Sequence, residues 1–262
     1  MNANNKFVAY SEASKKALKS ATILKSLKIS VLIEGEEGVG KLPLALEIAP
    51  KASVIDASKE SSLFSFLETL SEEETVIVKN FHNISNLTKF FHLQKELKFR
   101  VIALSNRKLD QRFIGDFFSI VIYLPPLRER KEDVMPLSRI YFEEVTKNLD
   151  IECDQEEFFK DFVPDLSDNA RSLKKSVYKY LLIHDFTKED IIKVLEKYFE
   201  KHIHGNDDYR KFLYFYELPL IRAGLKKYGS QLKLSKVLGL NRNTLRKKIQ
   251  ELENFLQKDE NR

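Results

Sequence analysis

The chain has 262 residues, of which 43% are hydrophobic, and it carries a net charge of +5 at neutral pH. This length is enough for one large and one small domain, and the single cysteine, Cys153, excludes an internal disulfide. No stretch approaches the roughly 20 apolar residues of a membrane span, so we expect a soluble, cytoplasmic protein that has no membrane partner.

Five short apolar runs in the first half of the chain predict strands. They occupy Ser30–Ile33, Ser53–Ile55, Thr75–Val78, Arg100–Leu104 and Ser119–Leu124. The intervals between them are wide enough for crossover helices, and the runs lack the polar alternation of half-exposed strands. The sequence therefore predicts an α/β domain with a parallel sheet.

A glycine-rich segment directly follows the first of these strands. It matches the P-loop pattern G-x-x-x-x-G-K and comprises Gly35, Glu36, Glu37, Gly38, Val39, Gly40 and Lys41, followed by Leu42. In such a loop the backbone amides and the lysine hold phosphates, so ATP or ADP is the expected ligand. Leu42 stands where most P-loops place a Mg²⁺-binding Ser or Thr. Mg²⁺ is therefore left open, as is an inherited loop without nucleotide.

The strand Thr75–Val78 ends in an unusual pair for a nucleotide hydrolase. A working site has Asp-Glu there, to position Mg²⁺ and to activate water, but this chain has Lys79-Asn80. We therefore assign no catalytic residue and no metal ligand, and we expect hydrolysis to be absent. Lys79 as a replacement for the Mg²⁺ charge and Lys79 as a solvated lysine remain alternatives.

After Pro125-Pro126 the pattern becomes helical. Residues 130–204 read as helices, with Asp133, Asp154 and Thr187 as N-caps. We predict an α/β domain over 1–128, a helical lid over 129–204, and a third domain over 209–262. The linker prediction falls on His202, Gly205, Asn206, Asp207 and Asp208, and the two histidines at 202 and 204 are interpreted as linker residues rather than metal ligands.

The third domain reads as a basic helix-turn-helix. Residues 211–262 hold 12 Lys or Arg and 5 Asp or Glu. Ser230–Leu238 is the predicted first helix, Gly239 the tight turn, and Asn241–Ile249 the start of the second helix. The predicted core comprises Leu234, Val237, Leu238, Leu240, Leu245, Ile249 and Leu252.

This arrangement predicts double-stranded DNA as a partner. The first residues of the second helix are placed to read bases, namely Asn241, Arg242, Asn243, Thr244 and Arg246. Four lysines suit phosphates, namely Lys233, Lys236, Lys247 and Lys248.

Three further segments resemble motifs of the sigma-54 enhancer-binding proteins, a family of AAA+ activators. Pro125–Arg130, followed by Glu132-Asp133-Val134, resembles L-P-P-L-R-E-R-x-E-D-I, and Arg100–Arg107 resembles the sensor I strand. Asp168–Leu173 resembles the sensor II segment. The resemblance covers nearly the whole chain and implies a parallel P-loop AAA+ sheet, a helical lid and a C-terminal Fis-type helix-turn-helix. It makes Asn106 the sensor residue and Arg171 the contact to the γ-phosphate, with a plain surface ion pair of Arg171 as the alternative.

The chain departs from the family at its functional loops. No G-A-F-T-G-A string occurs, and residues 42–74 are too few to hold that sigma-contacting loop. Within Phe113–Phe118, Ile114 stands at the position of the first arginine finger, and the stretch for the second is missing. The resemblance therefore implies a degenerate AAA+ domain that has lost ATPase activity.

Together these features predict a dimeric, sequence-specific DNA-binding transcription regulator. The resemblance places pairing in the C-terminal domain, and Phe212–Tyr216 is interpreted as internal packing or a dimer contact. Two alternatives stay open: an active ATP-dependent sigma-54 activator, and a non-catalytic adaptor to a complete homologue. Contact with RNA polymerase or with such a homologue is left open too.

Overall fold

The computed structural model describes residues 6–110, 114–184 and 186–259. Residue contacts divide the chain into two compact units, Met1–Phe186 and Thr187–Arg262, and each is described by itself. Among the described residues, no helix combines the length and the apolar character needed to cross a bilayer.

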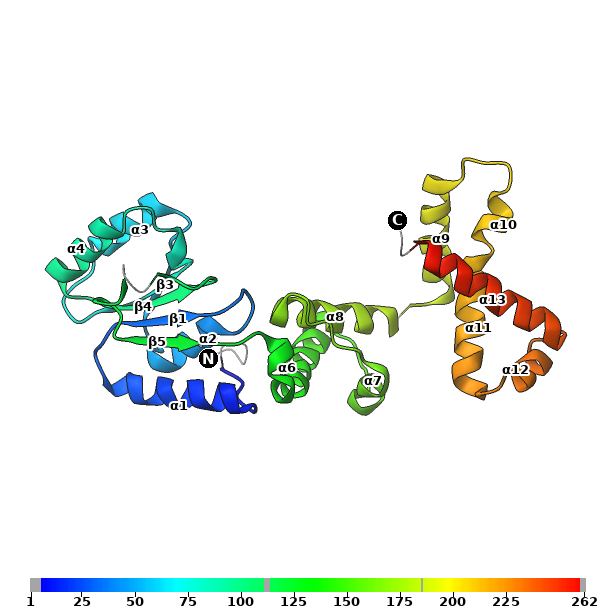
Figure 1. Cartoon of the computed structure of the whole chain (residues 1–262), viewed down its shortest axis with the longest axis horizontal. Coiled ribbons are helices and arrows are strands. Elements are labelled where there is room, and N and C mark those ends of the chain that lie inside the picture. The colour runs from blue at the N-terminus through cyan, green and yellow to red at the C-terminus, as the bar shows by residue number, and fades with distance from the viewer. Residues whose placement is uncertain (1–5, 111–113, 185, 260–262) are drawn as a thin grey trace. The chain divides into compact units, whose positions relative to one another are not determined.

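The first unit contains a five-stranded parallel sheet (Figure 1). Its strands are β1 (Val31–Glu34), β2 (Ser53–Asp56), β3 (Thr75–Lys79), β4 (Arg100–Ser105) and β5 (Ile120–Tyr123). Their order across the sheet is β2-β3-β4-β1-β5. All five predicted strands are confirmed to within one or two residues.

Helices cover both faces of the sheet, which explains the continuous apolar runs. One face packs on α1 (Glu12–Ser26) and α2 (Lys41–Ile48), and the other on α3 (Glu60–Leu67) and α4 (Leu87–Leu97) (Figure 1). Successive strand residues enter opposite cores, as they must in a pleated strand. The carboxyl ends of the strands remain free of helices and form one edge, where ligands bind in such sheets.

A helical subdomain follows the sheet. It contains a short 3₁₀ turn η3 (Leu127–Glu129), then α6 (Lys131–Leu149), α7 (Gln155–Asp161) and α8 (Asn169–His184). Its core is built around Phe142, Phe158 and Leu173. Asp154 caps α7 by accepting from the Glu157 amide, as predicted.

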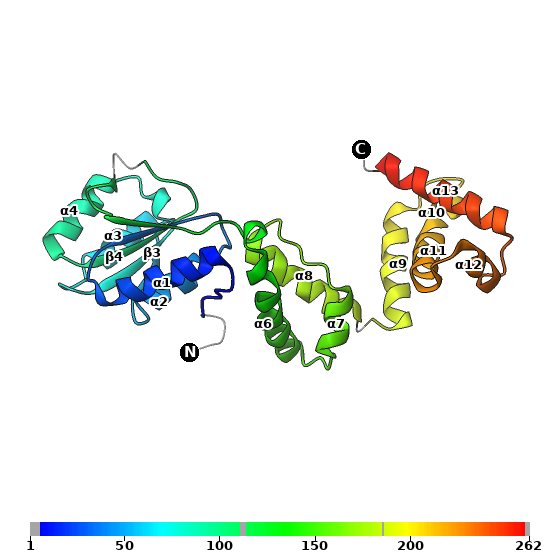
Figure 2. The ribbon, with the colours of Figure 1, turned by 60° about the horizontal axis from the view of Figure 1, so that its bottom comes forward.

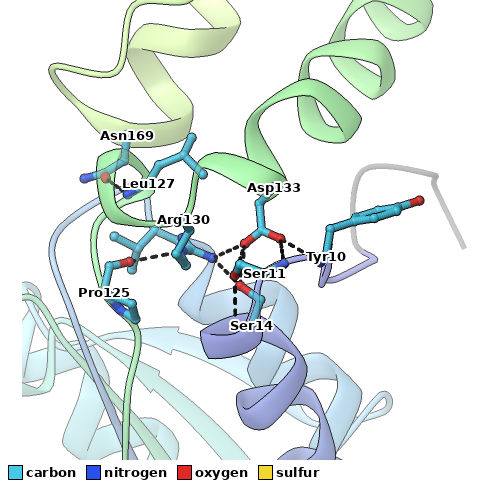
Figure 3. A network of polar contacts seen from close by, with 9 residues as sticks. Tyr10, Ser11, Ser14, Pro125, Leu127, Arg130, Asp133 and Asn169 are labelled. Atoms are coloured by element: carbon cyan, nitrogen blue, oxygen red, sulfur yellow. Dashed lines mark hydrogen bonds and ion pairs between the residues drawn. The ribbon is translucent and has the colours of Figure 1, made fainter.

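The predicted N-cap Asp133 is wrong, because α6 begins at Lys131 and Asp133 lies within its first turn. Its carboxylate, 1% exposed, reaches back to the chain ahead of α1 (Figure 3). It accepts hydrogen bonds from the Tyr10 and Ser11 amides, at 2.6 and 2.8 Å, and from the Ser11 and Ser14 hydroxyls, at 2.9 and 2.5 Å. Four donors on one carboxylate thus join the N-terminal segment to the helical subdomain.

Arg130 completes this buried network (Figure 3). Its guanidinium, 3% exposed, pairs with Asp133 at 3.3 Å and donates to the Ser14 hydroxyl at 2.9 Å. It also donates to the carbonyls of Pro125 and Val39, at 3.0 and 2.7 Å. Since Val39 belongs to the P-loop, one buried arginine ties that loop to the start of α6.

The described residues of the second unit form helices and no strands (Figure 2). It contains α9 (Lys188–His202), α10 (Asp208–Phe212), α11 (Tyr214–Tyr228), α12 (Gln231–Val237) and α13 (Arg242–Asp259). Thr187 forms the predicted cap of α9, as a capping box with Asp190.

The predicted boundary at 204–209 is wrong, because α9 belongs to the second unit. The rings of Tyr198 and Phe199 contact those of Phe212 and Phe215, with centroids 4.9 to 6.4 Å apart. These aromatic contacts hold α9 against α10 and α11. The predicted linker is therefore a connection between two helices of one unit.

The helix-turn-helix is confirmed, with α12 and α13 joined through Gly239 in the left-handed conformation at φ 65°. Its buried core comprises Ile221, Leu234, Leu245 and Leu252. Val237 is 56% exposed, so its predicted core position is wrong. The core instead draws on α11, where a Cβ on Gly224 would lie 2.3 Å from a methyl group of Leu234.

Candidate nucleotide cavity and DNA-binding surface

The P-loop leaves β1 and curls into α2. A Cβ at Gly35 would lie 2.4 Å from the Leu124 carbonyl oxygen, and Gly40 precedes α2 at φ 98°. Only glycine fits these two positions without strain. The Lys41 side chain, 8% exposed, donates from Nζ to the carbonyls of Gly35 and Glu36, at 2.7 and 2.6 Å. The loop therefore encloses its lysine.

Burial lowers the pKa of Lys41 to about 8, against the raising effect of Glu37 and with a further lowering effect of Arg171. At neutral pH the ammonium group therefore keeps most of its charge. A bound phosphate would stabilise that charge and raise the pKa again.

A polar cavity opens where the P-loop meets the carboxyl ends of the strands. It is lined by Glu37, Gly38, Gly40, Lys41, Leu42, Pro43, Asp56, Lys79, Asn80, Leu104, Asn106, Tyr141, Ala170 and Arg171. The structure thus brings Lys41, Asn106 and Arg171, which are far apart in the sequence, to one site. Glu36 and Val39 do not line this cavity.

Three strand ends are linked by hydrogen bonds inside the cavity. Asn106 Nδ2 donates to Asn80 Oδ1 at 3.3 Å, and Asn80 Nδ2 donates to Asp56 Oδ1 at 2.9 Å. Lys79 Nζ lies 3.6 Å from Asp56 Oδ2. Lys79 is thus paired with a carboxylate that the sequence analysis did not select.

Asp56 is held in its charged form. Partial burial acts to raise its pKa, but hydrogen bonds from Asn80 and Ser58 and the charge of Lys79 lower it to about 2. Such a carboxylate is a weak proton acceptor at neutral pH. The sequence could have identified Asp56 as a site residue, because it ends a predicted strand. In the sheet that strand neighbours β3, and Asp56 is in register with Lys79.

The helical subdomain approaches the P-loop through the start of α8. The Ala170 amide donates to the Gly38 carbonyl at 3.2 Å, and Asn169 Nδ2 donates to the Glu37 carbonyl at 2.9 Å. The Arg171 guanidinium pairs with the Glu37 carboxylate at 2.6 Å. This pair is the surface ion pair that the sequence analysis kept as the alternative for Arg171.

Glu36 points to a different arginine. Arg128 donates to both of its carboxylate oxygens, at 2.9 and 2.6 Å. Hydrogen bonds from Arg128 and then Asn169 lower the pKa of Glu36 to about 2. The two P-loop glutamates therefore each satisfy one arginine of the segments that follow the sheet.

A second, more apolar pocket adjoins the polar cavity and shares Gly38, Gly40, Pro43, Tyr141 and Ala170 with it. Its other lining residues are Lys6, Phe7, Val8, Val39, Leu127, Arg130, Asp133, Leu137 and Ile140. An apolar pocket beside a cationic one fits the base and the phosphates of a nucleotide. Sequence reasoning missed this pocket because Phe7, Val8 and Ile140 carry no motif.

On the second unit, the start of α13 presents a polar, basic surface. Its exposed residues are Asn241, Arg242, Asn243, Thr244, Arg246 and Lys247. Asn241 Oδ1 accepts from the Asn243 amide at 2.9 Å and so fixes the start of the helix. Lys233 and Lys236 are exposed on α12. The residues predicted to read bases thus lie together at one helix start.

Lys248 is the exception among the predicted DNA contacts. Its side chain is only 27% exposed, and Nζ pairs with the carboxylate of Glu217 on α11. This partly buried ion pair joins α13 to α11. We therefore assign Lys248 to the packing of this unit and correct its prediction as a phosphate contact.

Residues 214–252 match the family described as "Bacterial regulatory protein, Fis family". Over 200 residues the chain is 28% identical to the "DNA-binding transcriptional regulator NtrC" of Rhizobium meliloti (strain 1021). This match covers 58% of the chain and 41% of that relative. The chain thus matches less than half the length of the curated relative.

Solved structures show the same fold. NtrX from Brucella abortus in complex with ADP has a TM-score of 0.56 at 13% identity, covering 95% of this chain and 69% of that one. The NtrX complex with ATP has a TM-score of 0.53 at 13% identity, covering 94% and 68%. The chain has an AAA+ fold and a Fis-type helix-turn-helix, and it resembles the enhancer-binding regulators in the order of these parts.

Proposed function

We propose that this chain, in which an AAA+ fold precedes a Fis-type helix-turn-helix, is a sequence-specific DNA-binding transcription regulator. Its AAA+ unit holds ATP or ADP without hydrolysing it, and its C-terminal unit pairs with a second copy. The observation that carries the proposal is the exposed surface at the start of α13, which follows the turn at Gly239. In helix-turn-helix proteins these residues enter the major groove.

The chemistry of this surface suits a duplex. Arg and Asn side chains pair bidentately with guanine and adenine edges, and Arg242, Asn243 and Arg246 are exposed there. Lys233, Lys236 and Lys247 surround them with positive charge, which contributes affinity for phosphates without reading sequence. Residues that read bases, with lysines around them that contact phosphates, predict DNA binding that is both sequence-specific and salt-dependent.

The Arg242→Ala variant is expected to lose about 1 to 3 kcal/mol of binding free energy on a duplex selected from a random library. It should also lose its preference at one base pair, because the bidentate contact reads that pair alone. Fluorescence anisotropy on the selected duplex and on each single-base variant measures both effects. A uniform loss on every sequence would place Arg242 on the phosphate backbone.

Lys247→Ala is the matched control for this experiment. It should weaken binding evenly across sequences and reduce the salt slope by about one unit, as expected for a phosphate contact. A change of base preference in this variant would contradict the assignment. If no duplex bound at low ionic strength, the proposed function would be wrong.

The AAA+ unit supports nucleotide binding by shape and charge. The apolar pocket at Phe7, Val8 and Ile140 suits a base, and Lys41 and Arg171 supply cations for phosphates. Support for Mg²⁺ is weaker, because the carboxylates of the cavity, Glu37 and Asp56, are both paired with cations. We therefore infer that nucleotide binding does not require the metal.

Two observations support the loss of hydrolysis. Lys79 and Asn80 occupy the strand end where a metal ligand and a base are needed. Ile114, at the position of an arginine finger, is buried in the sheet core at 1% exposure. In the described residues 57–74, only α3 lies between β2 and β3. This short connection is a separate observation, and it supports the proposal that the chain lacks the sigma-contacting loop.

The position of Asp56 favours the alternative of an active ATPase. Its carboxylate lies in the cavity proposed for the phosphates, where a carboxylate could hold a metal ion or activate water. We expect phosphate release from ATP to stay at background, with and without DNA, because Asp56 is bound to Lys79 and Asn80. A coupled phosphate assay on the wild type and on Asp56→Ala measures this. Rapid release that Asp56→Ala abolishes would establish the active enzyme instead.

The pairing surface that we propose includes α9. This helix carries Ile191, Ile192, Val194, Leu195, Tyr198 and Phe199, and none of its 15 residues is buried. An apolar groove runs beside it, with Ile191, Phe199, Tyr209, Tyr216 and Leu220 among its lining residues. Tyr198 and Phe199 pack on α10 and α11, whereas Ile191, Ile192 and Val194 stay exposed and are available to a partner.

A second copy of the chain fits this face. α9 holds four lysines and four acidic residues, so it is neutral, and two copies meet without net repulsion. Proteins of this kind also bind two half-sites as symmetric dimers. Phe212 and Phe215 pack internally, whereas Tyr216 stays exposed in the groove. The dimer contact therefore involves Tyr216 and α9 rather than the whole cluster 212–216.

A further inference from the structure

We propose that Glu37 of the P-loop makes the cavity select nucleoside diphosphates over triphosphates. The inference rests on the proposed nucleotide binding and goes beyond it, because it names the ligand class and the residue that sets it. Glu37 and Arg171 line the same cavity, and their charged groups are 2.6 Å apart. The arginine expected to meet a terminal phosphate is thus already paired with a carboxylate of the chain.

Backbone contacts hold the two partners together. The Glu37 carbonyl accepts from Asn169 Nδ2 at 2.9 Å, and the Gly38 carbonyl accepts from the Ala170 amide at 3.2 Å. Glu37 and Arg171 are therefore brought side by side by the residues next to them, and not by their long side chains alone. Asn169 itself is fixed, because its Oδ1 accepts from the Leu127 amide at 2.7 Å.

The pair can still be broken. The Arg171 and Glu37 side chains are 61% and 50% exposed, and ion pairs in such positions are worth little because water screens them. A ligand phosphate can therefore displace Glu37 from Arg171. The displaced carboxylate, however, remains on the loop that surrounds the phosphates, so it then repels the negative charge that replaced it.

The charge balance of the cavity makes the third phosphate costly. Three cations, Lys41, Lys79 and Arg171, face two carboxylates, Glu37 and Asp56. Lys79 is engaged by Asp56 at 3.6 Å, so it offers little to a ligand. A diphosphate can use Lys41 and leave the Arg171–Glu37 pair intact. A triphosphate adds negative charge and must also break that pair. Both carboxylates of the cavity are paired with cations, so neither is free to hold a metal ion that would offset this charge.

The test measures the dissociation constants of ADP and ATP by displacement of a fluorescent ADP analogue from the full chain, with EDTA and again with Mg²⁺. In EDTA we expect ADP to bind about tenfold more tightly than ATP, since one like-charge contact in a water-accessible cavity is of this order. Glu37→Gln should bring the ratio close to one, mainly by strengthening ATP. Glu37→Gln combined with Arg171→Gln should lose that gain, because the freed arginine provides it.

Glu156→Gln is the control, since it removes an exposed carboxylate of the same unit outside both pockets. It should leave the ratio of the ADP and ATP dissociation constants unchanged. A shift equal to that of Glu37→Gln would show that the effect comes from the net charge of the chain alone. Equal binding of ADP and ATP by the wild type, or an unchanged ratio in Glu37→Gln, would overturn the role of Glu37 alone. Failure of both nucleotides to bind any variant would overturn the proposed nucleotide site as well.

Discussion

Replacing Asp133 with alanine is expected to lower the free energy of unfolding of the first unit by about 3 to 5 kcal/mol. Asp133 accepts five hydrogen bonds, four from residues 10–14 and one from Arg130. It is the only acidic partner that the described contacts give to Arg130, which is 3% exposed. Without it, a buried guanidinium remains with carbonyl and hydroxyl partners only. The removal of one partner of such a pair costs more than the pair itself contributes.

Urea unfolding of the full chain measures this loss as a shift of the transition that belongs to the first unit. Glu132→Ala is the matched control, since Glu132 is exposed in the same turn of α6, and it should cost less than about 1 kcal/mol. Similar losses in both variants would show that Asp133 stabilises the protein only as an acidic residue in the first turn of α6, and not through the buried network. An unchanged transition in Asp133→Ala would contradict the energetic role of the network.

The same network predicts a pH dependence. Burial acts to raise the pKa of Asp133, but hydrogen bonds from Ser14, Ser11 and Tyr10 lower it below its ordinary value. A carboxyl group with a lowered folded-state pKa stabilises the protein above the unfolded-state pKa, which is about 4. The difference between wild type and Asp133→Ala should therefore be full at neutral pH and shrink as the pH falls below about 4.

Introducing glutamate at both Ile191 and Tyr216 is expected to convert the proposed dimer to a monomer. Both side chains are exposed and line the groove beside α9, so two charges on each copy would be buried at the interface. Affinity for a duplex with two half-sites should fall about 100-fold or more, because the second recognition helix no longer binds as part of one molecule. Affinity for a single half-site should stay unchanged.

Sedimentation velocity and anisotropy on the two duplexes measure these effects. Val163→Glu is the control, since Val163 is 79% exposed on the first unit. It should change neither the mass nor the affinity. A wild-type chain that remains monomeric at micromolar concentrations, with and without the two-site duplex, would contradict the pairing. So would a double variant that still sediments as a dimer.

Patterns that depend on neighbours in the sequence predicted the fold well. The five strands were visible because each is a short apolar run, and the central strands β1 and β4 are buried along their whole length. The P-loop was visible because its glycines and lysine have a fixed spacing. The turn at Gly239 was equally clear, since a left-handed residue between two amphipathic helices favours glycine.

Contacts between distant residues were not visible. α9 resembles the preceding helices in composition, but residue contacts place it in the second unit, where its rings pack on Phe212 and Phe215. Asp133 has the sequence context of a cap, yet four of the donors to its carboxylate lie more than 100 residues away. Lys248 reads as a phosphate contact until Glu217 on α11 is placed beside it. In each case the decisive partner belongs to another element.

The contact between Gly224 and Leu234 has a consequence for how binding preferences can change. Leu234 of α12 packs against Gly224 of α11, which has no side chain. The close approach of α12 to α11 therefore depends on the absence of a Cβ at position 224. A side chain there would push Leu234 and α12 away from α11, and the proposed base-reading residues of α13 would move with the displaced packing. Side chains at the exposed start of α13 can therefore vary one at a time, whereas the packing of α12 on α11 favours glycine at position 224.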